Sequence, residues 1–309
     1  MSKIAKVDVI IPTHNRAEFL SSAIASVLNQ TFQDFEITVV DDCSKDNILD
    51  SVRSFNDKRI QFIRNEIHKG EAGSRNVGIM NSNAEYIAFL DDDDEWLPDK
   101  LKLQIDLLEN SPATVGVVYT GYVEVNRANK KILWQMIPTQ KGNIYNNIFV
   151  KNYVGVPSTV VLRRACFEKV GLFDENIIYP TDYDLWIRLS NKFCFEYIEK
   201  PLVRYYVHEN SISRNLELRI RGAEKILKKY HQIFSLNSKA HGQCYVQIGK
   251  LYCLNGNMKK ARDTFLMAIR LQPFEIRNYF YLGISIFGTK AFRKLRDFIK
   301  RLLFNQVVH

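Results

Sequence analysis

Four consecutive carboxylates, Asp91, Asp92, Asp93 and Asp94, follow a short apolar run at residues 86–90. Crowded carboxylates repel one another, and this repulsion raises their pKa values unless a cation neutralises them. Hard divalent ions such as Mg²⁺ and Mn²⁺ prefer oxygen ligands, and magnesium sites often combine one or two carboxylates with substrate phosphates. In an extended segment Asp91 and Asp93 would project to the same side and could bind a metal and a ribose diphosphate together. The run therefore predicts a divalent metal site.

The acidic run has two other interpretations. A solvated surface loop, in which Asp94 caps the following helix, would need no bound ion. A calcium-binding EF-hand loop fits poorly, because counting from Asp91 places Trp96 where the loop requires glycine and Lys102 where it requires glutamate.

A second candidate for anion binding is the glycine-containing stretch at residues 70–75. Residues 71–75 open a predicted helix, and the free backbone N–H groups and the dipole of a helix N-terminus favour phosphate. Gly70 and Gly73 permit a ligand to approach the backbone closely. The alternative is an ordinary glycine-rich loop with Arg75 as a surface charge.

The surrounding sequence alternates between strand and helix patterns over about the first 125 residues. Apolar, β-rich runs predict strands at residues 7–11, 36–40, 59–63, 86–90 and 115–119. Helical spacing predicts one helix around Leu20, Ile24 and Val27, and another around Leu101, Ile105 and Leu108 that follows Pro98, a residue favoured in the first turn of a helix. This alternation predicts an α/β domain with a mostly parallel, doubly wound sheet.

Polar sequence follows three of the predicted strands, at residues 12–16, 41–46 and 91–96. In an open α/β sheet, ligands bind outside the carboxyl ends of the strands, where the winding changes direction. We therefore expect the three polar segments to lie together and to form one site.

These segments together resemble glycosyltransferase family 2, a family of inverting enzymes with the GT-A fold (a Rossmann-like sheet flanked by helices). The resemblance covers roughly residues 6–215 and rests on the order and spacing of several motifs. They are VIIPTHNR and VVDDCSKD, then GEAGSRNVGI, then AEYIAFLDDDDEWLPDKL, and finally VGLFDE followed by TDYDLWIRL. Any one motif is weak, and the combination is specific.

The resemblance implies a nucleotide site at the ends of the first two strands. Arg75 would assist the base or the phosphates, and Asp42 would hydrogen-bond to the edge of the base. His14 can stack on a planar base and Asp42 can accept from a ring N–H, although a loop histidine and a helix cap are the alternatives. Four residues would lie beside the base, namely Pro12, Thr13, His14 and Asn15.

The resemblance also implies the metal ligands. Asp93 would contact a Mn²⁺ or Mg²⁺ ion, and Asp91 or Asp92 would contact the ribose or the metal. His208 would lie near the metal or the diphosphate, with a purely structural histidine as the alternative. The four-residue acidic run leaves its register open, and we rank Asp93 first, Asp91 second and Asp92 third.

The residue that matches the catalytic base of the family is Asp182, just before an apolar helical pattern. Thr181 stands where the family usually has glutamate, so the supporting contact of that glutamate is not expected here. Asp182 would accept the proton of an acceptor hydroxyl as that oxygen attacks the anomeric carbon, so no covalent intermediate is needed. A helix N-cap is the alternative role of Asp182.

These assignments predict a metal-dependent, inverting glycosyltransferase. Its predicted donor is a nucleoside diphosphate sugar, with UDP-sugars favoured by their frequency in the family. Its predicted acceptor is a saccharide or a lipid-linked sugar in bacterial surface polysaccharide synthesis. The alternative, motivated by Thr181, is a catalytically silent scaffold protein that binds a nucleotide sugar.

The chain is expected to divide into a GT-A domain, residues 1–215, and a helical extension, residues 216–309. Spacing typical of a 34-residue tetratricopeptide unit occurs at about residues 242–286. Fewer than three repeats are marginal alone, so this segment is expected to pack on the first domain or on a protein partner. The positions are Tyr245, Ile248, Gly249, Tyr252, Gly256, Ala261, Phe265, Ala268 and Pro273.

Residues 290–301 contain six basic residues and one acid, and they predict a basic amphipathic helix. One interpretation is peripheral contact with the anionic inner face of the plasma membrane. The other is a helix that caps the repeat.

The composition is that of a globular protein, with 309 residues, 46% hydrophobic and 25% charged. The five scattered cysteines predict neither disulfides nor zinc, and the N-terminus predicts no signal peptide, so we expect a cytoplasmic protein. The net charge of +9 makes nucleic-acid binding a rival function. Because the densest polar cluster of the strand-rich half is acidic, no nucleic-acid partner is expected.

Overall fold

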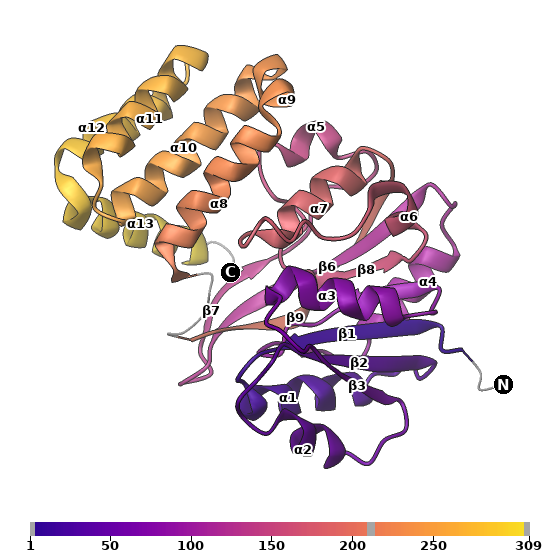
Figure 1. Cartoon of the computed structure of the whole chain (residues 1–309). Coiled ribbons are helices and arrows are strands. Elements are labelled where there is room, and N and C mark those ends of the chain that lie inside the picture. The colour runs from indigo at the N-terminus through magenta and orange to yellow at the C-terminus, as the bar shows by residue number, and fades with distance from the viewer. Residues whose placement is uncertain (1–3, 209–213, 306–309) are drawn as a thin grey trace. The chain divides into compact units, whose positions relative to one another are not determined.

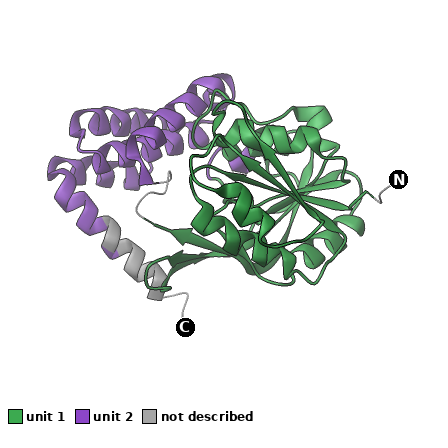
Figure 2. Cartoon of the chain, turned by 60° about the horizontal axis from the view of Figure 1, so that its bottom comes forward, with its two compact units in different colours: residues 1–145, 152–208 green, residues 146–151, 209–309 purple. Residues whose placement is uncertain are grey.

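The computed structural model describes residues 4–208 and 214–305. The chain divides into two compact units, residues 1–145 with 152–208 (unit 1) and residues 146–151 with 209–309 (unit 2) (Figure 2). The division after residue 208 lies before the boundary expected at residue 215. The sequence pattern did not indicate that the short segment Asn146–Lys151 belongs to the second unit.

Unit 1 alternates strands with helices (Figure 1). Its strands are β1 (Val7–Thr13), β2 (Phe35–Asp41), β3 (Ile60–Arg64), β4 (Tyr86–Phe89), β5 (Glu95–Trp96), β6 (Val115–Asn126), β7 (Ile132–Met136), β8 (Val160–Arg163) and β9 (Cys194–Val207). Its helices are α1 (Ala17–Leu28), α2 (Ile48–Arg53), α3 (Gly70–Asn81), α4 (Lys100–Glu109), α6 (Cys166–Val170), α7 (Thr181–Ser190) and a 3₁₀ turn (Pro157–Thr159). The short helix α5 (Tyr145–Ile148) lies at the division between the units.

Within the described residues, the strands form one nine-stranded sheet in the order β3-β2-β1-β4-β8-β6-β9-β5, with β7 paired to β6. β1 is parallel to β2 and β4, and β2 is parallel to β3. β8 is antiparallel to β4 and β6, β5 is antiparallel to β9, and β6 is parallel to β9. The predicted α/β fold class is confirmed, and the antiparallel pairings of the second half were not predicted.

Alternate residues of β1, β2 and β4 face one side of the sheet and pack on α1, α2 and α4. The predicted helix faces are fully buried there: Leu20, Ile24, Val27, Leu101, Ile105 and Leu108. The second helix follows Pro98 as predicted, and it begins at Lys100 with Asp99 as its N-cap, so Pro98 itself lies outside the first turn. The carbonyl oxygen of Pro98 instead accepts a hydrogen bond from the backbone N–H of Thr31 at 2.8 Å, which holds Pro98 outside the helix.

Helix α3 packs on β1, and Gly78 makes the close approach. A Cβ added at Gly78 would lie 2.5 Å from Ile10 Cγ2, and an isoleucine side chain has little χ1 freedom with which to move away. We expect Gly78→Ala to lower the free energy of unfolding by about 1–3 kcal/mol, measured by urea denaturation.

Gly283, in a helix of unit 2, is the matched control for that substitution. No atom lies within 4 Å of a Cβ added there, so Gly283→Ala should be neutral or slightly stabilising through the higher helix propensity of alanine. If the Gly78→Ala protein were as stable as the wild type, the close contact between α3 and β1 would not be needed for stability.

Unit 2 is helical, with α8 (Leu216–Lys229), α9 (His231–Leu236), α10 (Ser238–Leu254), α11 (Met258–Leu271), α12 (Ile276–Ile286) and α13 (Gly288–Asn305). The positions of the predicted repeat fall on α10, α11 and the turns that follow them, with Gly256 at a φ of +86° between the two helices. Ala261, Phe265 and Ala268 are fully buried, and a Cβ added at Gly249 would meet the Phe265 ring at 2.5 Å. A tightly packed helix pair therefore exists at the predicted place, and its assignment to the tetratricopeptide class stays a prediction.

The predicted basic helix, residues 290–301, lies in α13. The side chains of residues 296, 297 and 299–305 lie outside the described part of the chain. Among the described helices, none is both long enough and apolar enough to span a bilayer.

Candidate active site

The three polar segments meet at one edge of the sheet, because β1 runs parallel to both β2 and β4. The Thr13 hydroxyl donates to Asp92 Oδ2 at 2.7 Å, which joins the end of β1 to the acidic run. His14 Nδ1 lies 2.7 Å from the carbonyl oxygen of Asp42, which joins the ends of β1 and β2. The convergence expected from the sequence is confirmed.

The acidic run is a turn, in which the Asp94 backbone N–H donates to the carbonyl oxygen of Asp91 at 3.0 Å. The expectation of an extended segment was therefore wrong. Burial nevertheless alternates along the run: Asp92 and Asp94 are buried, and Asp91 and Asp93 are half-buried. The two half-buried carboxylates are the ones that a ligand can reach.

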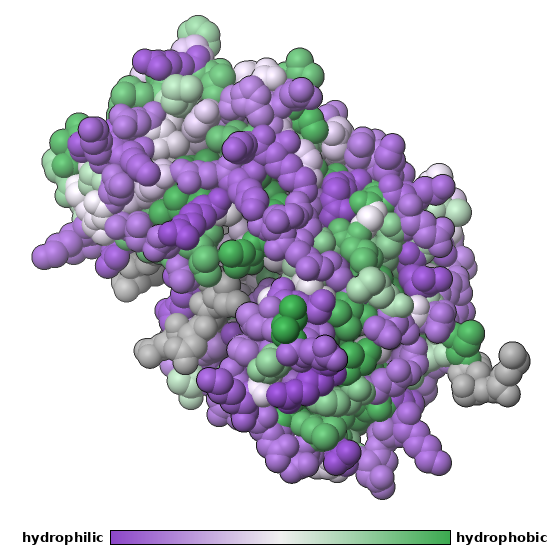
Figure 3. Space-filling model, viewed as in Figure 1, coloured by the Kyte–Doolittle hydropathy of each residue, from purple (hydrophilic) through white to green (hydrophobic). Residues whose placement is uncertain are grey.

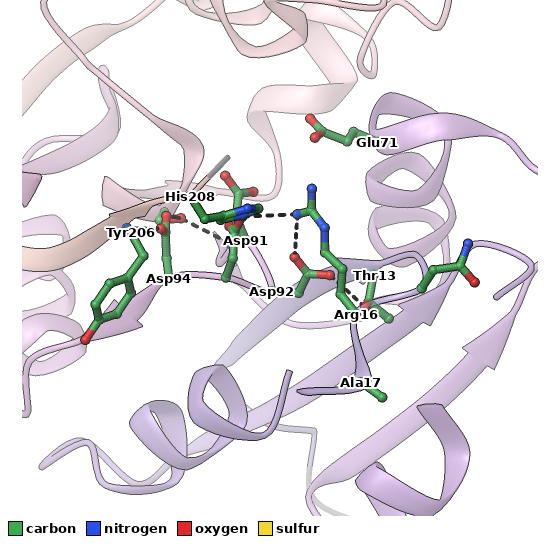
Figure 4. Close-up of polar contacts among 12 residues, drawn as sticks. Thr13, Arg16, Ala17, Glu71, Asp91, Asp92, Asp94, Tyr206 and His208 are labelled. Atoms are coloured by element: carbon green, nitrogen blue, oxygen red, sulfur yellow. Dashed lines mark hydrogen bonds and ion pairs between the residues drawn. The ribbon is translucent and has the colours of Figure 1, made fainter. Parts of the chain in front are cut away.

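Asp92 and Asp93 share one guanidinium of the protein itself. Arg16 NH1 lies 3.0 Å from Asp92 Oδ1 and 3.1 Å from Asp93 Oδ2, and Figure 4 shows both Arg16 and Thr13 reaching Asp92. Removal from water raises the pKa of Asp92 to about 7, although Arg16 lowers it. The premise that a bound cation must neutralise the run was incomplete, because arginine side chains supply part of the positive charge.

Asp94 stabilises the turn through hydrogen bonds to residues outside the acidic run. Its carboxylate accepts a hydrogen bond from the Ser158 hydroxyl at 2.6 Å and another from the Tyr206 backbone N–H at 3.1 Å. Ser158 Oγ also accepts from the Asp91 backbone N–H at 3.1 Å. The alternative in which Asp94 caps the next helix is wrong, since the N-cap of α4 is Asp99. Sequence reasoning did not assign Ser158 to this role.

His208 and Asp93 lie at the point where a metal ion was predicted. His208 Nε2 is 2.9 Å from Asp93 Oδ2, and one oxygen of Asp91 and one of Asp93 accept no hydrogen bond from any described residue. A carboxylate and an imidazole suit Mn²⁺ as ligands. Within the described residues no three His, Cys, Asp or Glu side chains form a metal-binding group, so a cation here would take further ligands from substrate phosphates, as magnesium sites commonly do.

Arg127 is a further cation that sequence reasoning missed. Its NH1 donates to the backbone carbonyl of Asp93 at 2.8 Å, and its guanidinium lies over the rings of Phe19 and Tyr206, 4.0 and 4.9 Å from their centroids. Because Arg127 comes from the end of β6, outside every motif, no local signal could have identified it.

Asp42, which was predicted to contact the base, anchors the start of α3. Its carboxylate accepts hydrogen bonds from the backbone N–H groups of Lys69 at 2.8 Å and Gly70 at 2.7 Å, and His68 Nδ1 lies 2.8 Å from it. These contacts form part of the structure of the site. The proposed hydrogen bond from the base to Asp42 would be made in addition to them.

The loop after β1 is held by Asn15, which has a φ of +54°. Its backbone N–H donates to Ser44 Oγ at 2.9 Å, and its Oδ1 accepts from the Lys45 backbone N–H at 2.7 Å. Pro12 is a buried residue inside β1, opposite Val40. The loop therefore presents His14 and Asn15 at the surface, whereas Pro12 supports them from the strand.

Asp182 is the second residue of α7, which has Pro180 as its N-cap and no side-chain cap. The alternative of a capping role is therefore wrong. Asp182 Oδ2 accepts a hydrogen bond from Trp186 Nε1 at 3.3 Å. Withdrawal from water raises the pKa of Asp182 to about 6, with Arg75 lowering it and Asp91 raising it. The candidate base and the acidic turn thus act on each other electrostatically.

Arg75 links these two parts of the site and is itself buried. Its NH2 lies 2.6 Å from Asp91 Oδ1, and its NH1 donates to the Thr181 hydroxyl at 3.1 Å. The alternative interpretation, in which Arg75 is a surface charge, is therefore wrong. Thr181, at the position where the resemblance led us to expect glutamate, makes a neutral hydrogen bond to the same guanidinium.

We expect Arg16→Met to lower the free energy of unfolding by about 3 kcal/mol, because it leaves Asp92 buried without its charge partner. Urea denaturation measures the change. Arg53→Met, at an exposed position of α2, is the control and should leave stability unchanged. Equal stability of both variants would mean that Arg16 does not compensate the charge of the acidic turn.

Comparison with known proteins agrees with this geometry. The family model of glycosyl transferase family 2 matches residues 8–171. A similar protein of Escherichia coli, the UDP-Glc:alpha-D-GlcNAc-diphosphoundecaprenol beta-1,3-glucosyltransferase WfgD, is 33% identical over 211 residues, which cover 68% of this chain and 80% of that protein.

Two solved structures have a similar fold. S. aureus TarS 1–349 in complex with UDP-GlcNAc gives a TM-score of 0.60 at 17% identity, covering 94% of this chain and 92% of that one. The mannosyltransferase PcManGT of Pyrobaculum calidifontis, in complex with GDP-Man and Mn²⁺, gives 0.60 at 16% identity, covering 94% and 87%.

The fold and the site define a glycosyltransferase of the GT-A type. The chain belongs to glycosyl transferase family 2. The predicted family and enzyme class are confirmed.

Proposed function

We propose that this glycosyltransferase moves a sugar from a nucleoside diphosphate sugar, with UDP-sugars as the first candidates, to a hydroxyl of a saccharide or lipid-linked acceptor, with inversion. The name of WfgD specifies UDP-glucose and a diphosphoundecaprenol-linked acceptor, and TarS was solved with UDP-GlcNAc. These names support the choice of donor and acceptor classes, and a role in bacterial surface polysaccharide synthesis is proposed with them.

The observation that carries the proposal is the bridge through Arg75. One buried guanidinium contacts Asp91 on the donor side and Thr181, next to the candidate base Asp182, on the acceptor side. It therefore holds Asp91 of the acidic turn close to the start of α7, where the candidate base lies. Positioning of this kind can supply a large part of a rate enhancement.

In the proposed reaction Asp182 accepts the proton of the acceptor hydroxyl. The hydroxyl oxygen forms a bond to the anomeric carbon while the bond from that carbon to the diphosphate oxygen breaks, so a single displacement inverts the centre. The electron pair leaves with the nucleoside diphosphate. Arg16 and Arg75 lie near enough to the acidic turn to act on the charge of that leaving group.

We assign Asp93, with Asp91 and His208, to the binding of Mn²⁺ or Mg²⁺. A divalent ion bound there would stabilise negative charge on the diphosphate. Pro12, Thr13, His14, Asn15, Asp42 and Asp92 are proposed to form or support the nucleotide side.

Thermal shift tests the donor assignment. The full chain is heated with each common sugar nucleotide, with and without Mn²⁺, and a ligand at a hundred times its Kd should stabilise the native state by about 2.7 kcal/mol. The donor identified in this way is then assayed for release of its nucleoside diphosphate in the presence of acceptor saccharides. No shift with any sugar nucleotide would contradict the proposed function.

A lipid-linked acceptor would be presented at the inner face of the plasma membrane. We therefore place the enzyme in the cytoplasm with a peripheral contact at that face. A protein partner that binds the helical unit is the second proposed contact.

A further inference from the structure

Helix α12 exposes an unbroken apolar face. Successive residues of an α-helix are turned by about 100°, so the residues of this face lie within one third of the circumference. Gly283 lies on the same arc, and the arc contains no charged residue. The exposed residues, with the fraction of each that is accessible, are Ile276 (80%), Tyr279 (48%), Phe280 (50%), Ile286 (68%) and Phe287 (74%), the last being the C-cap.

The opposite face of α12 already packs against the core of unit 2. Tyr281, Leu282 and Ile284 contact that core, and Asn278 and Ser285 are buried. The packing of unit 2 thus covers one side of α12, whereas a contiguous apolar patch that stays exposed commonly marks an interaction site. The exposed face, which we call the α12 face, is therefore not required by the packing of unit 2.

The next helix, α13, carries basic side chains. Lys290, Arg293 and Lys294 are exposed and lie on one side of that helix, together with Phe298, which is 60% accessible. α13 begins at Gly288, immediately after Phe287. Figure 3 shows hydrophobic residues exposed among hydrophilic ones on the helical region.

The charge of the whole chain is distributed unevenly. Residues 209–309 contain 19 Lys and Arg against 6 Asp and Glu, whereas residues 1–208 contain 24 against 28. The helical region therefore carries a net charge of +13 and the rest of the chain −4. A partner that meets the helical region should be anionic.

We propose that the α12 face, together with the basic side of α13, which follows α12 in the chain, docks unit 2 on an anionic lipid bilayer. Apolar and aromatic side chains enter the boundary between headgroups and acyl chains, while Lys and Arg contact the anionic headgroups. A soluble polyanion would satisfy the charge and leave the apolar face in water. A second copy of the chain would bring two strongly basic regions together, which like charge opposes.

The docking proposal rests on the proposed function in one respect: the contact would bring the enzyme to a lipid-linked acceptor. Binding itself is measured without any sugar nucleotide. The full chain is sedimented with vesicles of phosphatidylcholine alone and with vesicles that contain about one third phosphatidylglycerol, at low and high salt. We expect binding to the anionic vesicles only, weakened by salt.

Two double variants separate the apolar and the ionic parts. Phe280→Ser with Phe287→Ser should weaken partitioning by about a hundredfold, if each ring loses about half of the transfer free energy of a buried phenylalanine. Lys290→Ala with Lys294→Ala should weaken it by about thirtyfold, from about fivefold for each basic residue near an anionic surface. Since all four side chains are exposed, unchanged thermal unfolding is expected and confirms that the variants fold.

Matched controls lie in unit 1. Met80→Ser removes a side chain that is 64% accessible on α3, and Lys58→Ala with Lys192→Ala removes two exposed positive charges. Both controls should bind the anionic vesicles nearly as well as the wild type.

Three results would overturn the proposal. The first is equal binding of the wild type to both kinds of vesicle, or to neither. The second is full vesicle binding by the Phe280→Ser, Phe287→Ser variant, which would leave only a polyanion site. The third is a wild-type dimer in light scattering that becomes a monomer in that variant, which would identify the α12 face as a self-association surface. If the protein fails to bind vesicles but transfers sugar to a soluble acceptor, the docking proposal is wrong and the proposed function is unaffected. If it binds anionic vesicles but transfers no sugar, the proposed function is wrong and the docking proposal is unaffected.

Discussion

In Asp93→Asn the rate of sugar transfer should fall by roughly 10²–10³-fold. The substitution keeps the size of the side chain but removes the negative charge that Arg16 and His208 contact at 3.1 and 2.9 Å. It thereby weakens the proposed metal site without removing its bulk. The measurement is release of the nucleoside diphosphate over a Mn²⁺ titration, in which the Mn²⁺ concentration for half-maximal rate should also rise.

The control for this prediction is Asp106→Asn. Asp106 is an exposed residue of α4 whose carboxylate lies 3.1 Å from Lys102, so the variant should keep the wild-type rate. If Asp93→Asn left both the rate and the manganese dependence untouched, the assignment of the metal to the acidic turn would be wrong.

Asp182→Asn should reduce kcat by about 10²–10⁴-fold, the usual contribution of a general base. Asparagine can keep the contact with Trp186 but cannot take up the acceptor proton. Calorimetry should show the donor bound as tightly as in the wild type, which separates lost chemistry from lost binding. The control, Asp263→Asn at an exposed position of α11, should have wild-type kcat, and a high kcat in Asp182→Asn would assign the base elsewhere.

The same carboxyl predicts the pH dependence of the wild-type enzyme. Burial raises the pKa of Asp182 to about 6, in spite of the opposing effect of Arg75. Because a base acts in its deprotonated form, kcat/KM should be level above that pH and fall about tenfold for each unit below it. A profile that stays level down to pH 4.5, with the protein still folded, would exclude Asp182 as the base.

Local pattern was enough to predict the first half of the fold. Strands β1 to β4 and helices α1 and α4 follow from apolar spacing, because a buried strand and a helix face each need apolar residues at a fixed period. The convergence of the polar segments follows from the parallel order of the strands. The positions of β5, β8 and β9 were not predicted, since their partners lie far away in the chain and are chosen by packing, and the β6–β7 hairpin was missed as well.

The details of the site depended on such distant segments. The acidic turn is held by Ser158, Arg127 and His208, which are 64, 34 and 115 residues away from the aspartates that they contact. None of these contacts has a signature in the sequence around residues 91–94. The extended conformation expected for the run was wrong because the Asp94 backbone N–H bonds to the carbonyl of Asp91.

The sequence by itself determined the family, the α/β class and the residue types available for chemistry, since these depend on identity and spacing along the chain. Only the tertiary structure decided which carboxylates a ligand can reach, which are neutralised by Arg16 and Arg75, and that α12 turns an apolar face outward. The reason is that burial and charge balance are set by neighbours in space. A carboxylate or a phenylalanine has the same place in the sequence whether it is covered or exposed.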